Sequence, residues 1–400
     1  MISVSEASRL VLSHLWSPSE VFVALADASG RVLSRDIYAD RDLPPYNRVA
    51  MDGIAIRQAE FLNGVLEYQI SGVIAAGDPP RVMEGSGVCM EVMTGAVLPV
   101  RADAVVRFED CTIRDGRAVI NITSIDPGMN IHAQGSDLRG GERLLTKGSV
   151  LSPAEIPMLA SIGHSTVPVF AAPATAMIST GDELVAVNEQ PLPHQIRRSN
   201  MAAVAAAMKP FGATCTEHHF GDNEFIDGKA HAAQKLQAIL HEADLIIFSG
   251  GVSKGKFDWV PEALEAAGIH CVFHHVAQRP GKPLWFGTGN GKIVFALPGN
   301  PVSVFICLYR YVLPWLRASL GMKEPHLFAS LSEDFRSEIP LTHFVQVRVT
   351  ADDHLVATLV PGGGSGDFVN LRRADGFLEI PPRAGLLQKG MKFPYLPFRN

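Results

Sequence analysis

The sequence predicts a multidomain protein in which a central, mainly parallel α/β domain is joined to two β-rich parts. Strand-like and helix-like segments alternate over residues 173–320, which is the pattern of a parallel sheet covered by helices. Short β-type runs separated by glycines fill residues 54–121 and recur beyond Gly321. A chain of 400 residues also exceeds what one hydrophobic core usually supports, so several domains are expected.

The composition is that of a globular protein, and its net charge of −6 argues against a general nucleic-acid binder. Hydrophobic residues make up 47% of the chain, which excludes a disordered protein. The five cysteines form no C-x-x-C pair, a usage typical of a reducing compartment. We read no signal peptide, and the longest apolar region, Val302 to Leu316, is too short to span a bilayer. We therefore expect a cytoplasmic protein with no membrane and no nucleic-acid partner.

Two segments near the β-rich part are predicted to be helical. Ser3–Glu6 is a capping box followed by apolar residues at helical spacing, and Ser152–Glu155 is a second capping box. We expect the two helical segments to pack against each other. The expected boundaries are a discontinuous helical domain of residues 1–42 and 140–172, and an inserted β-rich domain of residues 43–139.

The α/β domain is expected to span residues 173–323, and a separate small β domain residues 324–400. The elements expected in the α/β domain are strand 175–179, helix 201–211, strand 214–220, helix 226–241, strand 244–248, helix 258–267, strands 269–276 and 292–297, and helix 301–320. In sheets of this kind, ligands bind at the carboxyl ends of the strands. The loops at those ends are therefore the first candidates for a binding site.

Three of these loops have the composition of ligand-binding loops. Ser179–Leu184 offers hydroxyls and two carboxylates, which suit a polar ligand and a hard cation such as Mg²⁺. Ser249–Asp258 is Gly-rich and runs into a helix, so its N–H groups favour an anion. Leu297–Pro301 presents N–H groups at another helix start. Each loop alone also fits an ordinary turn, with Asp258 and Asn300 acting as helix N-caps.

A fourth motif, Arg279–Pro283, is a basic turn stiffened by two prolines. It fixes the cations Arg279 and Lys282 three residues apart, which suits a tetrahedral oxyanion or phosphate, although a charged surface turn is the alternative. His274 and His275 are not expected to bind one metal ion, because adjacent strand residues point to opposite faces. The four motifs together predict one anionic ligand that is rich in phosphate and bound to Mg²⁺.

With these motifs in place, the sequence resembles the molybdopterin molybdenumtransferase family, which comprises bacterial MoeA, the gephyrin E domain and its plant counterpart. The resemblance rests on the four motifs above and extends to Ala50–Gly53, Met93–Ala96 and Gly135–Asp137, so it covers nearly the whole chain. It implies a molybdopterin-binding α/β domain, a C-terminal β-barrel and an elongated homodimer whose cleft lies between the α/β domain of one subunit and the β domain of the other.

The resemblance also implies a reaction. Adenylylated molybdopterin and molybdate are the substrates, Mg²⁺ is the cofactor, AMP is released, and molybdenum is left on the dithiolene. A molybdopterin adenylyltransferase would be the donor, and molybdoenzyme apo-proteins would be the acceptors.

The same resemblance assigns roles to residues of this sequence. Asp258 and Glu183 are expected to hold Mg²⁺, and Asp222 is a further essential acid. Asp52, Thr94 and Asp137 are expected to reach in from the partner subunit. The expected catalytic set is Asp258, Glu183, Asp222, Lys282, Arg279, Asp52 and Asp137. Substrate binding is assigned to Thr180, Gly250, Gly251, Ser253, Thr94, Pro298 and Asn300, and the molybdate pocket to Arg279, Lys282, Pro283, Arg348 and Ser365.

Some positions depart from the family pattern. Arg279 stands where the family usually has Lys, and His275 where bacterial members often have a further Lys; Arg keeps the charge but prefers a planar, forked contact. A preference for tungstate, a divergent paralogue and a non-catalytic cofactor-handling scaffold therefore stay open as alternatives. The retained Asp258, Glu183 and Lys282 favour the enzyme. The motifs around Asp52 and Asp137 argue against a simpler pyrophosphate-cleaving enzyme of the same α/β fold.

Overall fold

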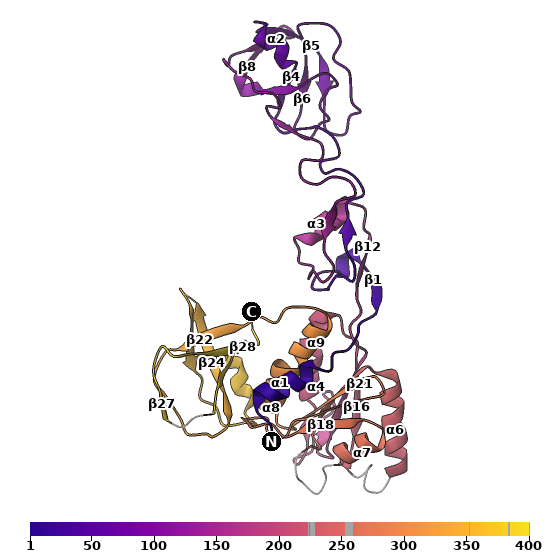
Figure 1. The fold of residues 1–400 in the computed structure, drawn as a ribbon, viewed down its shortest axis with the longest axis vertical. Coiled ribbons are helices and arrows are strands. Elements are labelled where there is room, and N and C mark those ends of the chain that lie inside the picture. Colours follow the sequence, from indigo (N-terminus) through magenta and orange to yellow (C-terminus); the bar gives the residue numbers. More distant parts are fainter. Residues whose placement is uncertain (223, 225–228, 253–258, 352, 383–384, 400) are drawn as a thin grey trace. The chain divides into compact units, whose positions relative to one another are not determined.

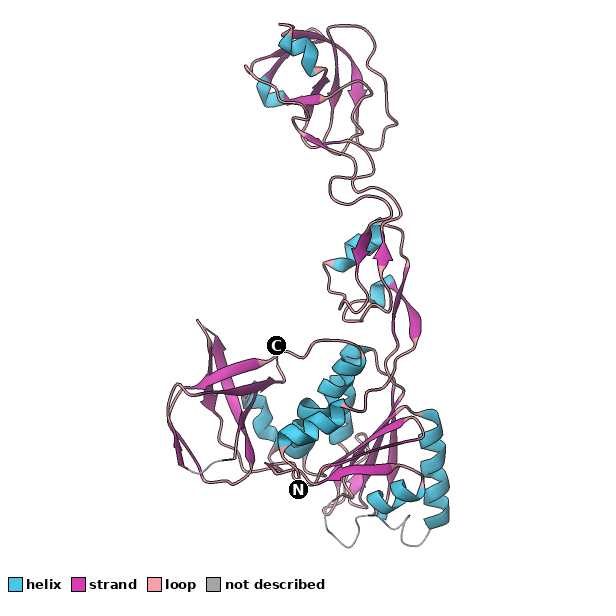
Figure 2. Ribbon diagram, in the orientation of Figure 1, coloured by secondary structure: helices cyan, strands magenta, loops and turns pink. Residues whose placement is uncertain are grey.

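The chain forms two compact units in the computed structural model, which describes residues 1–222, 224, 229–252, 259–351, 353–382 and 385–399. The first unit consists of residues 1–34, 148–153 and 166–400, and the second of residues 35–147 and 154–165. Figures 1 and 2 show their elements. The finer division into four domains, with the boundaries given above, stays a prediction.

A six-stranded sheet lies at the centre of the first unit, in the order β16-β13-β17-β21-β20-β18. The strands are β13 (Thr175–Thr180), β16 (Cys215–Phe220), β17 (Leu245–Ser249), β18 (His270–His274), β20 (Trp285–Gly289) and β21 (Lys292–Leu297). The first four strands in the sheet order are parallel, which confirms the predicted α/β class. The sheet also contains β20, antiparallel to both of its neighbours, which the sequence analysis did not predict.

Helices cover both faces of this sheet, and Figure 1 shows α6 and α7 on one side and α4 and α8 on the other. Alternation along β17 explains the two layers, because Leu245 and Ile247 belong to one core cluster whereas Ile246 and Phe248 belong to the other. The helical elements of the first unit are α1 (Val4–Leu12), α4 (Asn200–Met208), α6 (Lys229–Glu242), α7 (Val260–Ala266), α8 (Pro301–Cys307), a π-helix η4 (Leu308–Val312), α9 (Leu313–Ser319) and the short 3-10 helices η1 (Leu25–Asp27), η3 (Lys209–Phe211) and η5 (Phe368–Arg373).

The N-terminal helix forms as its capping box predicts. The Ser3 hydroxyl accepts a hydrogen bond from the Glu6 N–H (3.1 Å), and the apolar face of α1 is buried in the core of the first unit. The second capping box is wrong in position: α3 begins at Glu155, and the N-cap position is Ala154. We had expected α1 and α3 to pack against each other. α3 belongs to the second unit, and the apolar face of α1 packs on the α/β core of the first unit.

The C-terminal strands of the first unit close into a barrel. β24 (Thr342–Ala351), β25 (Leu355–Leu359), β22 (Leu327–Leu331), β28 (Lys392–Pro397) and β26 (Gly376–Ile380) pair in that order, and β26 pairs back with β24. The β-barrel-like C-terminal domain is therefore confirmed. The short strand β19 (Gln278–Arg279) pairs in parallel with β24, which ties the basic turn to the barrel. Smaller pairs in this unit are β1 (Glu20–Ala24) with β12 (Thr166–Phe170), β14 (Leu184–Val185) with β15 (Ile196–Arg197), and β23 (Phe335–Ser337) with β27 (Gly385–Leu387).

The second unit is β-rich, as predicted. Its main sheet has the order β7-β4-β6-β5-β9-β8. The elements are β2 (Ile37–Tyr38), β3 (Arg48–Val49), β4 (Gly53–Ile56), α2 (Gln58–Leu62), β5 (Glu67–Ile74), β6 (Val88–Val92), β7 (Ala104–Arg107), η2 (Phe108–Asp110), β8 (Cys111–Arg114), β9 (Arg117–Ile120), β10 (Ile131–His132), β11 (Arg143–Leu145) and α3 (Glu155–Ser161). Outside the main sheet, β3 pairs with β10 and β2 with β11.

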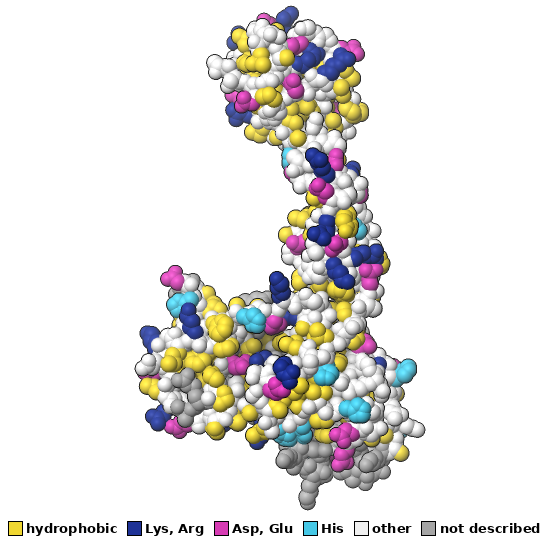
Figure 3. Space-filling view, in the orientation of Figure 1, with side chains coloured by type: hydrophobic (Ala, Val, Ile, Leu, Met, Phe, Trp, Pro, Cys, Tyr) yellow, Lys and Arg dark blue, Asp and Glu magenta, His cyan; other side chains and the backbone are white. Residues whose placement is uncertain are grey.

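Acidic and basic side chains are interspersed over the described surface of both units on the face shown in Figure 3. An anion site on this acidic chain therefore depends on charges gathered locally. None of the helices among the described residues combines the length and the hydropathy that crossing a membrane requires.

Candidate active site

Three loops meet where the parallel strands β13, β17 and β21 end. The N–H of Gly250 donates to the carbonyl of Leu297 (3.0 Å), which joins the second loop to the third. The Thr180 hydroxyl donates to the carbonyl of Ser249 (3.4 Å), which joins the first loop to the second. The structure thus brings together the three strand ends that the sequence analysis singled out. Ser253, Lys254 and Asp258 lie outside the described residues, so the roles assigned to Ser253 and Asp258 stay predictions.

The glycines of the second loop are required by close packing. Gly250 and Gly251 have φ values of 97° and 69°, which only glycine adopts without strain. A methyl group on Gly250 would lie 2.5 Å from the Thr180 Oγ1 and 3.1 Å from the Thr180 carbonyl oxygen. One on Gly251 would lie 2.6 Å from the Cγ2 of Val260. The loop can therefore lie directly against β13 and α7 only because it lacks side chains there.

Asn200, at the start of α4, holds two of these loops together. Its side-chain NH₂ donates to the Ser249 Oγ (2.8 Å) and to the Gly299 carbonyl (2.7 Å). Both amide hydrogens are used, so the position needs a carboxamide. The sequence signal was present as Ser199-Asn200 before a helix, but the two partners lie far away in sequence and could not be inferred from it.

Carboxylates gather beside the first loop. Burial raises the pKa of Asp222, and the nearby negative charges of Asp182 and Glu183 raise it further. The pair of predicted acids, Glu183 and Asp222, is thus close enough to interact, and Asp182 joins them. Repulsion of this kind is relieved by a bound cation. No cluster of three or more His, Cys, Asp or Glu side chains arranged to hold a metal ion occurs among the described residues.

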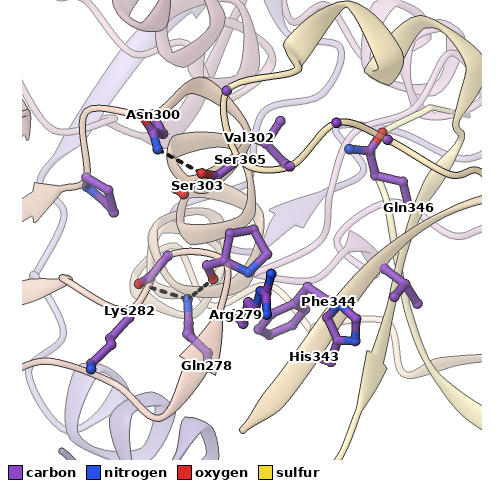
Figure 4. A pocket seen from close by; sticks show the side chains of 18 of the residues that line it. Gln278, Arg279, Lys282, Asn300, Val302, Ser303, His343, Phe344, Gln346 and Ser365 are labelled. Atoms are coloured by element: carbon purple, nitrogen blue, oxygen red, sulfur yellow. Dashed lines mark hydrogen bonds between the residues drawn. The ribbon is translucent and has the colours of Figure 1, made fainter. Parts of the chain in front are cut away.

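The basic turn lines a cavity of about 1000 Å³ (Figure 4). The walls come from the turn, the start of α8, strand β24 and the segment 359–366. Arg279 and Lys282 are the charged side chains among these lining residues, and none of the lining residues is acidic. Neither Arg279 nor Lys282 forms an ion pair with a described residue. Pro283 and Pro298 also line it. The cavity therefore has the charge expected for an oxyanion site.

Strand β24 contributes residues to this cavity that the sequence analysis missed. His343 lies opposite Arg279 in the β19–β24 register, and its Nδ1 is buried without a hydrogen-bond partner among the described residues. Burial lowers the pKa of His343, and the positive charge of Arg279 lowers it further, which favours a neutral imidazole. Gln346 lines the cavity, whereas the exposed Arg348 is not among its lining residues. The molybdate role of Arg348 has no support from its position and stays a prediction.

Ser365 and Asn300 join the far wall of the cavity to the third loop. The Asn300 side chain donates a hydrogen bond to the Ser365 Oγ (2.7 Å), as Figure 4 shows. The Val302 N–H donates to the Ser365 carbonyl (3.1 Å). Asn300 occupies the N-cap position of α8, but its side chain makes no capping hydrogen bond. The expected capping interaction is therefore wrong, because the side chain bonds Ser365.

A smaller cavity of about 210 Å³ adjoins the larger one. It is lined by Thr180, Glu183 and the segment that leads into α4, and it shares Gly299 and Asn300 with the larger cavity. A ligand lying across these two residues would contact the hydroxyl and carboxylate loop at one end and the basic turn at the other.

The three residues expected to act from a partner subunit lie in the second unit. The Asp52 carboxylate accepts hydrogen bonds from the N–H and the hydroxyl of Thr94 (both 2.6 Å), and the Thr94 contacts lower the pKa of Asp52. The Nε2 of His132 lies 2.8 Å from the Asp137 carboxylate, and the Nδ1 of His132 lies 2.9 Å from the Arg48 guanidinium. These side chains are mutually oriented within the unit, while their catalytic roles stay predictions.

The two histidines before the basic turn do not point to opposite faces. Their rings lie with centroids 3.9 Å apart. β18 ends at His274, and His275 has a φ of 74°, so the alternation of an extended strand stops between them. The expectation that His274 and His275 point to opposite faces was therefore wrong.

Three family models match the chain in order along its length. The MoeA N-terminal region (domain I and II) matches residues 2–163, the probable molybdopterin binding domain matches residues 176–318, and the MoeA C-terminal region (domain IV) matches residues 329–398. A molybdopterin molybdenumtransferase from Synechocystis sp. is 35% identical over 99% of both chains. Another from Staphylococcus epidermidis is 31% identical over 95% of this chain and 91% of its own.

Solved structures are similar over the whole chain as well. The crystal structure of a molybdopterin biosynthesis MoeA protein from Pyrococcus horikoshii has a TM-score of 0.84 and 29% identity, and covers 100% of both chains. A second structure from the same organism has a TM-score of 0.82 and 26% identity at the same coverage.

Proposed function

This chain belongs to the molybdopterin molybdenumtransferase family, and we propose that it inserts molybdate into adenylylated molybdopterin and releases AMP. It is an enzyme of molybdenum cofactor biosynthesis. In the proposed reaction, water cleaves the anhydride bond between AMP and the molybdopterin phosphate. The two dithiolene sulfurs replace two oxygen ligands of molybdate, and these oxygens leave as water with the thiol protons.

One observation carries the proposal most directly. The strand-end loops of a molybdopterin-binding domain adjoin a cavity whose lining charges are Arg279 and Lys282, with no acid among the lining residues. Molybdate is a tetrahedral oxyanion, and two fixed cations bind such a group with little reordering. The second cavity, which shares the lining residues Gly299 and Asn300, provides room for the phosphate portion of the substrate beside Glu183.

A magnesium ion fits the acids of the first loop. Burial raises the pKa of Asp222, crowding with Asp182 and Glu183 raises it further, and a cation would remove that repulsion. Mg²⁺ is usually held by one or two carboxylates together with substrate phosphates and water, so a large all-protein cage is not required. We propose Glu183 and Asp258 as its ligands. When bound, the ion would neutralise charge on the phosphate that leaves.

The remaining steps belong to the side chains and backbone of this chain. The Gly250 N–H holds the second loop to Leu297, so phosphate oxygens bind to the N–H of Gly251, and the Thr180 hydroxyl supports the same loop. Arg279 and Lys282 orient molybdate towards the dithiolene, and stabilise negative charge as the oxygen ligands are exchanged. Ser365 and Pro283 shape the pocket around the oxyanion.

We further propose that the enzyme acts as a homodimer, with Asp52, Thr94 and Asp137 supplied by the partner subunit. Their ordered contacts within the second unit support a role beyond that of solvated acids. A molybdopterin adenylyltransferase would be the donor, and molybdoenzyme apo-proteins the acceptors. Cytoplasmic location stays a prediction.

The decisive experiment follows both products. The full-length protein is incubated with adenylylated molybdopterin and Mg²⁺, with and without molybdate, and AMP and metal-loaded cofactor are quantified. We expect AMP release to depend on molybdate and to match metal transfer one to one. A parallel tungstate series measures metal preference. A scaffold would bind the substrate without releasing AMP, and equal AMP release without molybdate would contradict the transferase.

Asp222→Asn is expected to raise the melting temperature of the metal-free protein at pH 7. The pKa of Asp222 is raised on folding, so its ionised form opposes folding, and this cost is present above the folded pKa and absent below the unfolded value of about 3.9. The gain should therefore vanish near pH 3.5, and Mg²⁺ should reduce it at pH 7 by stabilising the wild type. Calorimetry at both pH values measures the effect.

Glu6→Gln serves as the opposite control for this measurement. Hydrogen bonding and charge from Arg9 lower the pKa of Glu6, so this variant should lose stability at pH 7, regardless of Mg²⁺. A melting temperature of Asp222→Asn that is at or below the wild-type value at pH 7 would contradict the repulsion among the three acids.

A further inference from the structure

A buried polar cluster lies directly beneath the basic turn. Gln278 is 0% exposed, Tyr311 1% and Cys307 0%, so all three are shielded from water. Burying a carboxamide is costly unless its groups are hydrogen-bonded. The partners of Gln278 therefore indicate why a polar side chain is kept at this position.

Each polar end of the Gln278 side chain has a defined partner. Its Nε2 donates to the carbonyls of Pro280 (3.2 Å) and Gly281 (3.2 Å), the two residues between Arg279 and Lys282, as Figure 4 shows. Its Oε1 accepts a hydrogen bond from the Tyr311 hydroxyl. The side chain thus connects the backbone of the turn to the helical segment behind it.

The helical segment is irregular at the point of contact. Tyr311 lies in the π-helix Leu308–Val312, between α8 and α9, and such insertions often occur at functional sites. Burial raises the pKa of Tyr311 well above its usual value, so the hydroxyl keeps its proton and remains a donor. A tyrosine at this place provides a permanent donor for the Gln278 Oε1.

The turn rests on this cluster without any intervening side chain. Gly281 has a φ of 89°, and a methyl group there would lie 2.6 Å from the Gln278 Nε2 and 3.0 Å from the Cys307 sulfur. The carbonyl of Lys282 accepts from the N–H groups of Val276 (3.0 Å) and Leu284 (2.9 Å). The backbone on either side of Lys282 is therefore fixed from below by the amide of Gln278 and laterally by the chain itself.

We propose that Gln278, held by Tyr311, is a positioning residue that presents Arg279 and Lys282 to the oxyanion. The inference rests on the proposed function for the identity of that anion. The side chains of Gln278 and Tyr311 are not required to touch substrate. They act through the backbone of the turn, whose two cations need a fixed separation to bind one tetrahedral ion.

Tyr311→Phe and Gln278→Met are the test variants, measured in the full-length protein. Tyr311→Phe removes only the hydroxyl that fixes the amide, and Gln278→Met removes the amide while keeping most of its volume. Tyr309→Phe is the matched control, because Tyr309 lies in the same π-helix with its ring against Phe305 and Phe398. Thr175→Val controls for general stability, since it removes one buried hydrogen bond at the opposite end of β13.

We expect the KM for molybdate to rise about 10-fold in both test variants while kcat at saturating molybdate changes by less than about threefold, since a small displacement of positioned groups weakens binding steeply. Amide hydrogen exchange in a peptide covering residues 276–284 should become faster in these variants, whereas the rest of the first unit is unchanged. Tyr309→Phe should alter neither quantity, whereas Thr175→Val should leave the KM for molybdate unchanged and accelerate exchange uniformly over the first unit.

Gln278→Glu adds a pH readout that a merely structural role would not produce. The introduced carboxylate accepts from Tyr311 but cannot donate to the two carbonyls, and protonation restores one donor. Its KM defect should therefore shrink as the pH is lowered, whereas the defect of Gln278→Met should not.

Two results would overturn the positioning role. One is an unchanged KM for molybdate in both Tyr311→Phe and Gln278→Met. The other is exchange that accelerates uniformly over the first unit, as expected for Thr175→Val. Hydrogen exchange is measured without substrate, so it tests whether Gln278 and Tyr311 fix the turn even if the protein is inactive. A wild-type protein that releases no AMP in response to molybdate would refute the proposed function and leave this test of the turn intact.

Discussion

Replacing Lys282 with methionine is expected to lower kcat/KM for molybdate by about two orders of magnitude, the loss typical for removing one preorganised donor to an oxyanion. Lys282 is exposed at the cavity, and its ammonium group forms no ion pair with any residue that the structure describes, so its charge is available to a ligand. Methionine keeps the length of the side chain and removes the charge. The rate of molybdate-dependent AMP release measures the effect.

Lys292→Met is the control for this substitution. Lys292 is the first residue of β21, at the end of the sheet opposite the cavity, and its Nζ contacts the carbonyl of His241 (3.4 Å). We expect its activity to stay within about twofold of the wild type, as is usual for a surface substitution away from the site. Lys282→Arg should recover part of the loss, since the charge returns with different geometry. Wild-type molybdate dependence in Lys282→Met would mean that the oxyanion binds elsewhere.

The parts of the site that follow from local sequence were the predictable ones. The apolar run of β17 followed by glycines identifies a buried strand and a close approach, and the strand-end rule then places its loop beside those of β13 and β21. The barrel was expected from the family resemblance, while the residues alone indicated only a small β domain. The signal for the strand and its loop is contained within a few consecutive residues, whereas the signal for the barrel came from motifs spread along the whole chain.

The contacts that support the site were not predictable, because each joins residues distant in sequence. The amide of Asn200 bonds Ser249 and Gly299, and the amide of Gln278 bonds the turn and Tyr311. Both residues look like ordinary polar positions in a single sequence. Which groups their amides bond can be seen only in the folded structure, where the partners lie beside them.

Strand β20 shows the same limit for secondary structure. Its glycines reduce the strand signal, yet they are what the sheet requires. A methyl group on Gly287 would lie 2.6 Å from the His270 carbonyl, and one on Gly289 would lie 2.1 Å from the Gly268 carbonyl. The close approach to β18 and to the turn before it, which excludes side chains, can be recognised only in the folded sheet.

Gly250→Ala is expected to reduce kcat/KM for adenylylated molybdopterin by about two orders of magnitude. The added methyl group would lie 2.5 Å from the Thr180 hydroxyl oxygen and 3.1 Å from the Thr180 backbone carbonyl, so the loop must move away from β13. That movement also breaks the hydrogen bond from Gly250 to Leu297 (3.0 Å), which joins the second loop to the third. A misplacement of about 1 Å at positioned groups costs on the order of 100-fold in rate.

Gly291→Ala separates this effect from backbone strain. Gly291 has a comparable left-handed φ of 75°, against 97° at Gly250, but a methyl group there would meet no atom within 4 Å. It lies between β20 and β21, at the opposite end of the sheet. Denaturant unfolding should show a loss of about 1 kcal/mol from the strained backbone in Gly291→Ala. The loss should be larger in Gly250→Ala, where the contact with Thr180 and the broken hydrogen bond to Leu297 add to the strain. Only Gly250→Ala should lose activity. Equal losses of activity in both variants would mean that stability, and not the contact with Thr180, makes Gly250 necessary.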